Sequence, residues 1–235
     1  MDAHTVQANG TSVWGEKIVI AAGSEPVVPA VVGRDLAITS DEILFLPTFP
    51  RSLVLVGAGV IGLEMASAFA DLGARVTVIA RDPEILPAFD RDVAAHIRTI
   101  LEDRGVTFHL GASLERLSGT AGAVTAHVKH DGRHLAVTAA QVCLAVGRRY
   151  NPKRLGTDAL GLVMGRLGLR VSEHLRTSLP HIYAAGDAAG NLQLTPTAAY
   201  EGRLAALNAL KGDVAPVDYG VVRASSQSTR ATASG

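Results

Sequence analysis

The sequence predicts an α/β protein whose parallel sheet has helices on its faces and an antiparallel β-hairpin layer beside it. Strand-like and helix-like stretches alternate in the order β-α-β-α-β between residues 52 and 110. A glycine-rich turn, residues 57–62, joins the first of these strands to the first helix. Asp131-Gly132 separates two stretches of alternating polarity, which is typical of a hairpin. Alternation of strands and helices favours a parallel sheet.

The first half of the chain gives its elements in a clear order. Residues 17–22 form a short apolar run that predicts a buried strand. Residues 25–50 contain prolines and little periodicity, so we expect a connection with one helical turn near residues 40–42. Residues 52–56 predict a second buried strand. A helix is expected over residues 63–72, and Gly73 ends it.

The following elements complete the predicted sheet and its hairpin layer. Residues 75–80 predict a strand, residues 90–104 a helix capped by Asp90, and residues 106–110 a third strand. Later elements are a hairpin over 123–138, strands over 141–146 and 181–185, and a helix over 196–210. Residues 213–235 are expected to be a disordered tail, because the last fifteen lack apolar periodicity.

Composition excludes several classes of function. The chain of 235 residues has 22 basic and 22 acidic side chains, so no basic excess points to nucleic acid or a membrane surface. A single cysteine excludes a disulfide framework, an internal redox dithiol and a multi-cysteine metal site, and we expect no metal. The apolar stretch 53–63 is too short to span a bilayer, and no signal sequence is evident. These features favour a cytoplasmic location.

The glycine-rich turn carries the strongest chemical signal. Gly57, Gly59 and Gly62 follow a strand and open a helix, with Val60 and Ile61 between them. In such a motif the first glycine permits a tight turn, the second admits a pyrophosphate, and the third lets the helix pack on the strand. The diphosphate then faces the positive end of the helix dipole. The turn therefore predicts a Rossmann-like dinucleotide site, the alternative being a ligand-free βα turn.

The end of the second strand of this fold bears on which dinucleotide binds. An acidic residue there would accept a hydrogen bond from the free ribose 2′-hydroxyl of NADH. The sequence instead has Arg81, whose guanidinium suits a 2′-phosphate, followed by Asp82. NADPH is therefore favoured and NADH is left open. A solvated charge at a strand end is the simpler alternative for Arg81.

Two further acidic residues are candidates for a site. Asp187 follows the predicted strand 181–185 and Gly186, which places a carboxylate at the carboxyl edge of a sheet, where it could bind a polyol such as a ribityl chain. Glu64 is expected in the first turn of its helix, where it either stabilises the helix dipole or has a functional role. A simple turn aspartate is the alternative for Asp187.

Four motifs in order make the chain resemble the pyridine nucleotide-disulfide oxidoreductases, such as mercuric reductase, dihydrolipoamide dehydrogenase and glutathione reductase. They occupy residues 18–24, 57–64, 145–151 and 177–187, and the resemblance covers roughly residues 17–210. It implies an NAD(P)H-binding Rossmann domain over 51–147 inserted in a partial FAD-binding domain. The latter comprises residues 1–50, with their connection, and a return segment over 148–212.

The resemblance also implies roles for particular residues. Glu64 would take part in catalysis by pairing with a lysine beside the flavin, and the positive end of the helix at 196 would stabilise reduced flavin. Asp187 would bind the FAD ribityl chain, Gly147 the nicotinamide-side ribose, and Leu114 would offer backbone near the adenine. The expected cofactor-binding residues are Gly23, Gly57, Gly59, Val60, Ile61, Gly62, Arg81, Leu114, Gly147, Gly186, Asp187, Gln193, Leu194, Thr195 and Pro196.

The chain departs from the family pattern at both ends. Members begin with an FAD-binding glycine motif and a Cys-x4-Cys pair and end with a dimerisation domain carrying a His-Glu pair, and none of these is found here. We therefore expect a central fragment of an enzyme that acts on a small-molecule substrate. The full enzyme would pass hydride from NADPH to FAD and on to a dithiol or metal ion. Mercuric-reductase-like activity ranks first and dihydrolipoamide-dehydrogenase-like activity second; an NAD(P)H-binding fragment without catalysis is the alternative.

Overall fold

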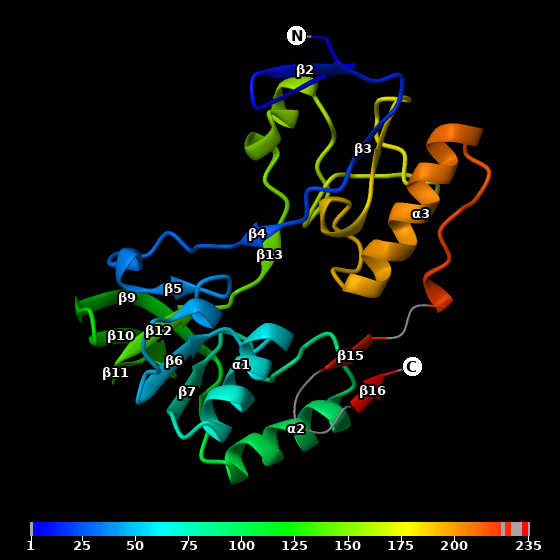
Figure 1. Cartoon of the computed structure of the whole chain (residues 1–235). Helices are drawn as coiled ribbons and strands as arrows, with labels where there is room; N and C mark the ends of the chain where they lie inside the picture. Colours follow the sequence, from blue (N-terminus) through cyan, green and yellow to red (C-terminus); the bar gives the residue numbers. More distant parts are fainter. Residues whose placement is uncertain (1, 222–223, 227–231, 235) are drawn as a thin grey trace. The chain divides into compact units, whose positions relative to one another are not determined.

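The chain forms two compact units in the computed structural model, which describes residues 2–221, 224–226 and 232–234 (Figure 1). The first unit comprises Met1–Glu25 and Arg148–Arg223, and the second comprises Pro26–Gly147 and Ala224–Gly235. The chain thus leaves the first unit after Glu25 and returns to it at Arg148.

A five-stranded parallel sheet forms the centre of the second unit. Its strands lie in the order β5-β12-β6-β7-β8, and each neighbouring pair is parallel. The bounds are β5 Ile38–Thr39, β6 Ser52–Val56, β7 Arg75–Ile79, β8 Thr107–His109 and β12 Gln141–Leu144. Every residue of β6 is buried, as expected for a strand covered on both faces. The predicted parallel α/β architecture is confirmed.

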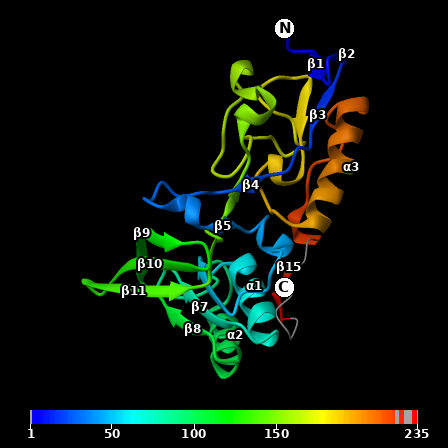
Figure 2. The ribbon, with the colours of Figure 1, turned by 60° about the vertical axis from the view of Figure 1, so that its left-hand side comes forward.

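Side chains of β6 point alternately to the two faces of the parallel sheet. One face packs against helices and the other against an antiparallel sheet, so the second unit has three layers with an apolar core on each side of the middle one. Leu53 and Leu55 pack in a core with helices α1 (Val60–Asp71) and α2 (Arg91–Asp103). Val54 and Val56 pack on the opposite face, against an antiparallel sheet. In Figures 1 and 2, α1 and α2 lie on one side of β6 and β7, and strands β9, β10 and β11 on the other. The alternation follows from the two-residue period of a strand.

The antiparallel sheet contains the hairpin that the sequence predicts. Its strands are β9 Ala112–Thr120, β10 Ala123–His130 and β11 Arg133–Ala139, in the order β11-β10-β9. Asp131 and Gly132 have φ values of 50° and 74°, the left-handed conformation that a two-residue hairpin turn needs. A register shift between His127 and Val128 marks a bulge in the pairing of β10 with β9.

Residues 26–50 belong to the second unit, and not to the flavin-binding domain in which the family resemblance places them. The reason is pairing and burial: β5 adds to the parallel sheet beside β12, and Val32 forms a parallel bridge with Arg116. Leu36 and Ala37 also pack against the core beneath the antiparallel sheet. The predicted helical turn near residues 40–42 occurs slightly later, as the 3-10 turn Ile43–Phe45, and another covers Arg34–Leu36.

The first unit combines a parallel strand pair with one long helix. Strands β3 (Ile18–Ile20) and β14 (Ile182–Ala184) pair in parallel, and α3 (Thr195–Lys211) packs Ala205 and Ala209 in a core with Tyr183 and Ala185 of the β14 segment. The smaller elements are β1 Thr5–Ala8, β2 Thr11–Trp14, β4 Glu25–Pro26, β13 Arg148–Arg149, and 3-10 turns at Pro152–Leu155, Thr157–Leu160 and Gly186–Ala188. Strand β4 pairs with β13.

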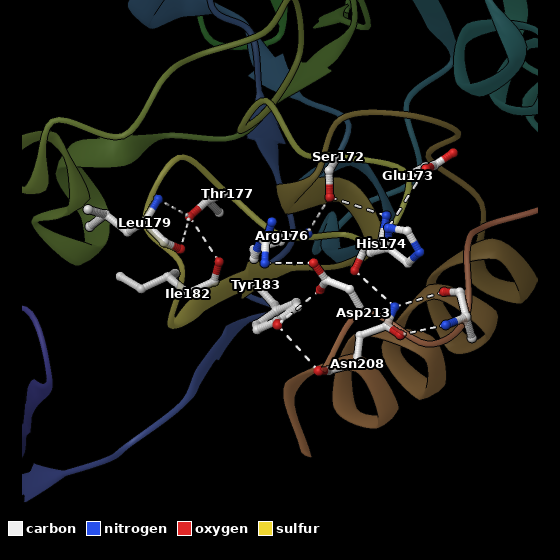
Figure 3. A network of polar contacts seen from close by, with 11 residues as sticks. Ser172, Glu173, His174, Arg176, Thr177, Leu179, Ile182, Tyr183, Asn208 and Asp213 are labelled. Atoms are coloured by element: carbon white, nitrogen blue, oxygen red, sulfur yellow. Dashed lines mark hydrogen bonds and ion pairs between the residues drawn. The ribbon is translucent and has the colours of Figure 1, made fainter. Parts of the chain in front are cut away.

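The segment directly after α3, up to Tyr219, is held against the first unit, which corrects part of the expected disordered tail over 213–235. Asn208, fully buried in α3, donates to the carbonyls of His174 and Ala215 and accepts from the Ala215 amide (Figure 3). Arg176 pairs with Asp213 at 2.6 Å. Beyond the 3-10 turn Tyr219–Val221, strands β15 (Ala224–Ser226) and β16 (Thr232–Ser234) pair antiparallel. Residues 222–223, 227–231 and 235 of the expected tail lie outside the described residues.

Candidate functional site

Two glycines of the turn between β6 and α1 are required by close packing. Gly57 has a φ of 119°, and a Cβ there would lie 2.3 Å from the Ala145 carbonyl oxygen. A Cβ on Gly62 would lie 2.2 Å from the carbonyl oxygen of Gly57. The Gly57 amide donates to the Ile79 carbonyl at 2.8 Å, which ties the turn to the end of β7. Any side chain at either position would therefore push the turn apart.

Gly59 lies in a different environment, with no heavy atom within 4 Å of the position a Cβ would take. Its φ of −82° and ψ of −178° are open to any residue, so neither packing nor backbone conformation requires glycine. Gly59 is the N-cap of α1, and the helix begins at Val60 with Ile61 and Gly62 behind it. The N–H groups of a first helical turn lack partners within the helix, and they suit an anion. Open space in front of them gives a phosphate room to approach.

Arg81 and Asp82 follow β7 at the same edge of the sheet. Ile79 and Ala80 are buried, and Arg81 and Asp82 are exposed. Both side chains are therefore accessible to a ligand bound at the neighbouring glycine turn. Glu64 is the fifth residue of α1, and no acidic residue lies in the first turn of that helix. The expectation that Glu64 stabilises the helix dipole from the first turn is therefore wrong.

Two other predicted residues of the second unit have unlike surroundings. Gly147 follows β12 with a φ of 125°, is exposed, and its carbonyl accepts from the Val27 amide at 2.9 Å. Leu114 lies in β9 opposite Val128, with its side chain partly buried against the core between the two sheets. Gly147 thus lies at the carboxyl edge of the parallel sheet, whereas the Leu114 side chain contributes to packing.

A polar chain links the ends of β3 and β14 in the first unit. Parallel neighbouring strands end at the same edge, so Gly23 and Ser24 after β3 approach Gly186 and Asp187 after β14. The Ser24 hydroxyl donates to Asp187 Oδ2 at 2.5 Å and accepts from Arg148 Nε at 3.0 Å. Arg148 also donates to the Ser24 carbonyl. The Asp187 carboxylate is therefore held in one orientation at this edge.

The start of α3 has two buried polar atoms without a hydrogen-bond partner, Gln193 Nε2 and Thr197 Oγ1. Leu194 is the N-cap, and Thr195 and Pro196 begin the helix. Native interiors rarely leave such groups unpaired, and an orphaned donor beside free helical N–H groups indicates a place for a polar ligand. Gln193 to Pro196 are the residues predicted here from the sequence.

Three residues that sequence reasoning missed complete the surroundings of Asp187: Ser24, Arg148 and Glu201. Glu201 is fully buried in α3 and accepts from the Gly186 amide at 2.7 Å. The sequence contained a pattern that could have identified Glu201 as a buried residue. The face that α3 buries carries four residues at helical spacing: Thr197, Glu201, Ala205 and Asn208. Polar residues on a buried stripe are informative because burial requires them to be paired.

The remaining candidate groups do not build a site in the described part of the chain. Across the residues described, no group of three or more His, Cys, Asp or Glu side chains is arranged to hold a metal ion. Burial, with a smaller effect from the Glu42 carboxylate, raises the pKa of the Cys143 thiol to about 12. The thiol therefore stays protonated within β12. No helix in the described ranges is long and apolar enough to cross a membrane.

Comparison with known proteins shows which family the chain resembles. A family model described as "Pyridine nucleotide-disulphide oxidoreductase" matches residues 1–202. A dihydrolipoyl dehydrogenase of Bacillus subtilis (strain 168) is 39% identical over 201 residues, covering 85% of this chain and 43% of the relative. A mercuric reductase of Bacillus cereus is 32% identical over 215 residues, covering 90% and 34%. A glutathione reductase of Burkholderia cepacia is 34% identical over 215 residues, covering 91% and 47%.

Solved structures match over nearly the whole chain. The HOCl-induced flavoprotein disulfide reductase RclA from Escherichia coli superposes with a TM-score of 0.83 at 30% identity, covering 97% of this chain and 53% of the other. The chain spans about a third to a half of the length of the three relatives compared above.

Proposed function

Because the chain belongs to the pyridine nucleotide-disulphide oxidoreductase family, we propose that its second unit binds NADPH and its first unit contributes to an FAD site. The family is one of flavin-dependent oxidoreductases that use a pyridine nucleotide. In the whole protein, a bound flavin would take a hydride from NADPH and supply the two electrons that reduce a disulfide to a dithiol, or a metal ion to a lower oxidation state. The chain's own residues would bind and orient the two cofactors.

The geometry of Gly57, Gly59 and Gly62 is the observation that carries the proposal. Packing accounts for Gly57 and Gly62, whose Cβ atoms would overlap backbone oxygens at 2.3 and 2.2 Å. Packing does not account for Gly59, which faces open space at the start of α1. A diphosphate needs that space and the helical N–H groups behind it. The contrast between the three positions is what a dinucleotide site requires.

The residues of the first unit fit the polar parts of FAD. Asp187 offers a carboxylate to a ribityl hydroxyl, and the left-handed conformations of Gly23 and Gly186, with φ values of 70° and 64°, allow the sharp turns after β3 and β14. Gln193 Nε2 and Thr197 Oγ1 are buried without partners at the start of α3. Leu194, Thr195 and Pro196 would direct the positive end of α3 at a flavin carbonyl.

Arg81 and Glu64 would decide which reductant binds and how it is oriented. The exposed guanidinium of Arg81 can pair with a 2′-phosphate at the end of β7, which favours NADPH over NADH. Glu64 would pair with a lysine to form the nicotinamide pocket, and Gly147 would lie beside the ribose. Leu114 would contribute its backbone near the adenine.

The strand end at Arg81 resembles that of mercuric reductases, whereas dihydrolipoamide dehydrogenases usually have an acidic residue there. A mercuric-reductase-like electron acceptor is therefore the first candidate, and a dihydrolipoamide-dehydrogenase-like acceptor is the second. Both classes are found among the relatives at comparable identity, 32% and 39%. The substrate in either case is a small molecule or ion, and the cytoplasm is the proposed location.

Titration of the purified chain with NADPH, NADH and FAD tests the proposal. We expect the fluorescence emission of NADPH to rise on binding, with a Kd at least about tenfold lower than that for NADH. FAD bound to the first unit should show quenched flavin fluorescence. Binding of neither nucleotide by a folded chain would overturn the proposal. Binding of NADPH alone would leave a nucleotide-binding module without flavin chemistry.

A further inference from the structure

Glu201 is a buried carboxylate whose hydrogen-bond donors, within the described part of the chain, are all uncharged. Its side chain lies on the inner face of α3 and is fully inaccessible to solvent. Oε2 accepts from the backbone amide of Gly186 at 2.7 Å, and Oε1 accepts from the Tyr219 hydroxyl at 2.5 Å and from Asn191 Nδ2 at 3.4 Å. Burying a charge is costly unless its lone pairs are satisfied, and here donors from three segments satisfy them.

The Gly186 amide is the contact that connects Glu201 to the proposed flavin site. Gly186 has a φ of 64° and opens the 3-10 turn Gly186–Ala188, which carries Asp187. A side chain at Gly186 would bring its Cβ to 3.0 Å from the Ala198 Cβ, so the turn sits close against α3. Glu201 therefore fixes the peptide immediately before Asp187, while Ser24 fixes the Asp187 carboxylate itself at 2.5 Å.

Tyr219 brings the segment that follows α3 into the same cluster. Its hydroxyl donates to Glu201 and accepts from Asn191 Nδ2 at 2.6 Å. Burial and the Glu201 carboxylate raise the pKa of the Tyr219 phenol, so it remains a donor. Asn208 and the Arg176–Asp213 pair fasten the chain between α3 and Tyr219, as Figure 3 shows. The cluster thus joins the turn, the loop after it and the segment beyond α3.

We propose that Glu201 is a positioning residue for Asp187, and that Tyr219 completes the arrangement by holding the second carboxylate oxygen. The proposal rests on the proposed function only in naming FAD as the ligand of Asp187. A carboxylate is suited to this task because it accepts from a backbone amide and a side-chain donor at once. Glutamine at position 201 could do the same, since its oxygen accepts from Gly186 and its amide can donate to the Tyr219 hydroxyl.

Hydrogen exchange and FAD titration of four variants of the full chain test this. In Glu201→Ala we expect the Gly186 amide to exchange about tenfold faster or more and the Kd for FAD to rise about tenfold or more. Glu201→Gln should restore both to within about threefold, and Tyr219→Phe should fall between them. Glu16→Gln, which changes an exposed side chain of the same unit, should match the unsubstituted chain.

The location of the exchange effect separates positioning from a general loss of structure. Faster exchange confined to residues 186–191, with amides of β3 and β14 still protected and NADPH affinity unchanged, supports positioning. Unchanged exchange at Gly186 in Glu201→Ala overturns it, as does faster exchange with unchanged FAD affinity. If Glu201→Ala does not fold, failure of Glu201→Gln to restore FAD affinity overturns it instead. Lack of FAD binding by the unsubstituted chain refutes the flavin part of the proposed function. The exchange rate of the Gly186 amide in Glu201→Ala then tests by itself whether Glu201 positions the turn that carries Asp187.

Discussion

Two single substitutions in the glycine turn, Gly59→Ala and Gly62→Ala, should separate nucleotide binding from stability. We expect Gly59→Ala to keep its stability and lose affinity for NADPH, and Gly62→Ala to lose stability. The two positions are only three residues apart and receive the same methyl group. Any difference between the variants therefore reports what each position faces.

The magnitudes follow from the surroundings of each glycine. A methyl group on Gly62 would lie 2.2 Å from the Gly57 oxygen, so the turn must open by roughly 1 Å to reach van der Waals contact. Overpacking of this kind costs about 1–3 kcal/mol. On Gly59 the methyl group meets nothing within 4 Å, and the backbone is extended. There, alanine should change stability by no more than about 0.5–1 kcal/mol, with a gain expected from the unfolded state.

Chemical denaturation and NADPH titration measure the two effects. Gly59→Ala should unfold at or above the urea midpoint of the unsubstituted chain, while its Kd for NADPH rises about tenfold or more because the methyl group occupies the space for the diphosphate. Gly62→Ala should unfold at a lower urea concentration. Undiminished NADPH affinity in Gly59→Ala would refute the claim that the open space in front of α1 receives a dinucleotide.

Two further substitutions and one labelling experiment test other parts of the structure. Arg81→Glu should raise the Kd for NADPH about tenfold or more and lower that for NADH, measured by titration; no change in their ratio would contradict a 2′-phosphate contact. At pH 8 the Cys143 thiol should react with iodoacetamide about a thousandfold more slowly than in the unfolded chain, since its pKa is raised from 9.0 to about 12; equal rates would contradict its burial. Because that pKa is raised, the stability the thiol contributes is complete below pH 9 and lost as the pH rises towards 12. Asn208→Ala should lower the free energy of unfolding by about 2–4 kcal/mol, since it leaves the Ala215 amide and two carbonyls without their partner.

Elements with strong local signals could be predicted from the sequence. The turn at Gly57–Gly62 and the hairpin at Asp131-Gly132 depend on backbone conformations that few residues adopt. Glycine and aspartate at these positions therefore predict both turns from the sequence. The buried strand Ser52–Val56 was equally clear, because both its faces are apolar. Asp187 could be placed at a sheet edge from the strand before it.

Features that depend on distant partners were missed. Residues 26–50 have no periodicity of their own, and β5 becomes a strand only by pairing with β12, about a hundred residues later. Ser24 and Arg148 meet across a similar separation. The hairpin of β1 and β2 is a different kind of omission: Asn9-Gly10 lies between its strands with φ values of 51° and 80°, so the usual turn signal was available.

The division of the first unit into two stretches of sequence has a consequence for how the protein folds. Ile18 pairs with Ile182, so an unfolded chain must close a loop of roughly 160 residues before β3 and β14 can meet. Once residues 26–147 have folded, only the flanking stretches remain flexible, and the loop shrinks to about 40 residues. That fourfold reduction lowers the entropic cost of closure by about 1 kcal/mol. Folding of the inserted unit before its host would therefore lower the entropic cost of pairing β3 with β14.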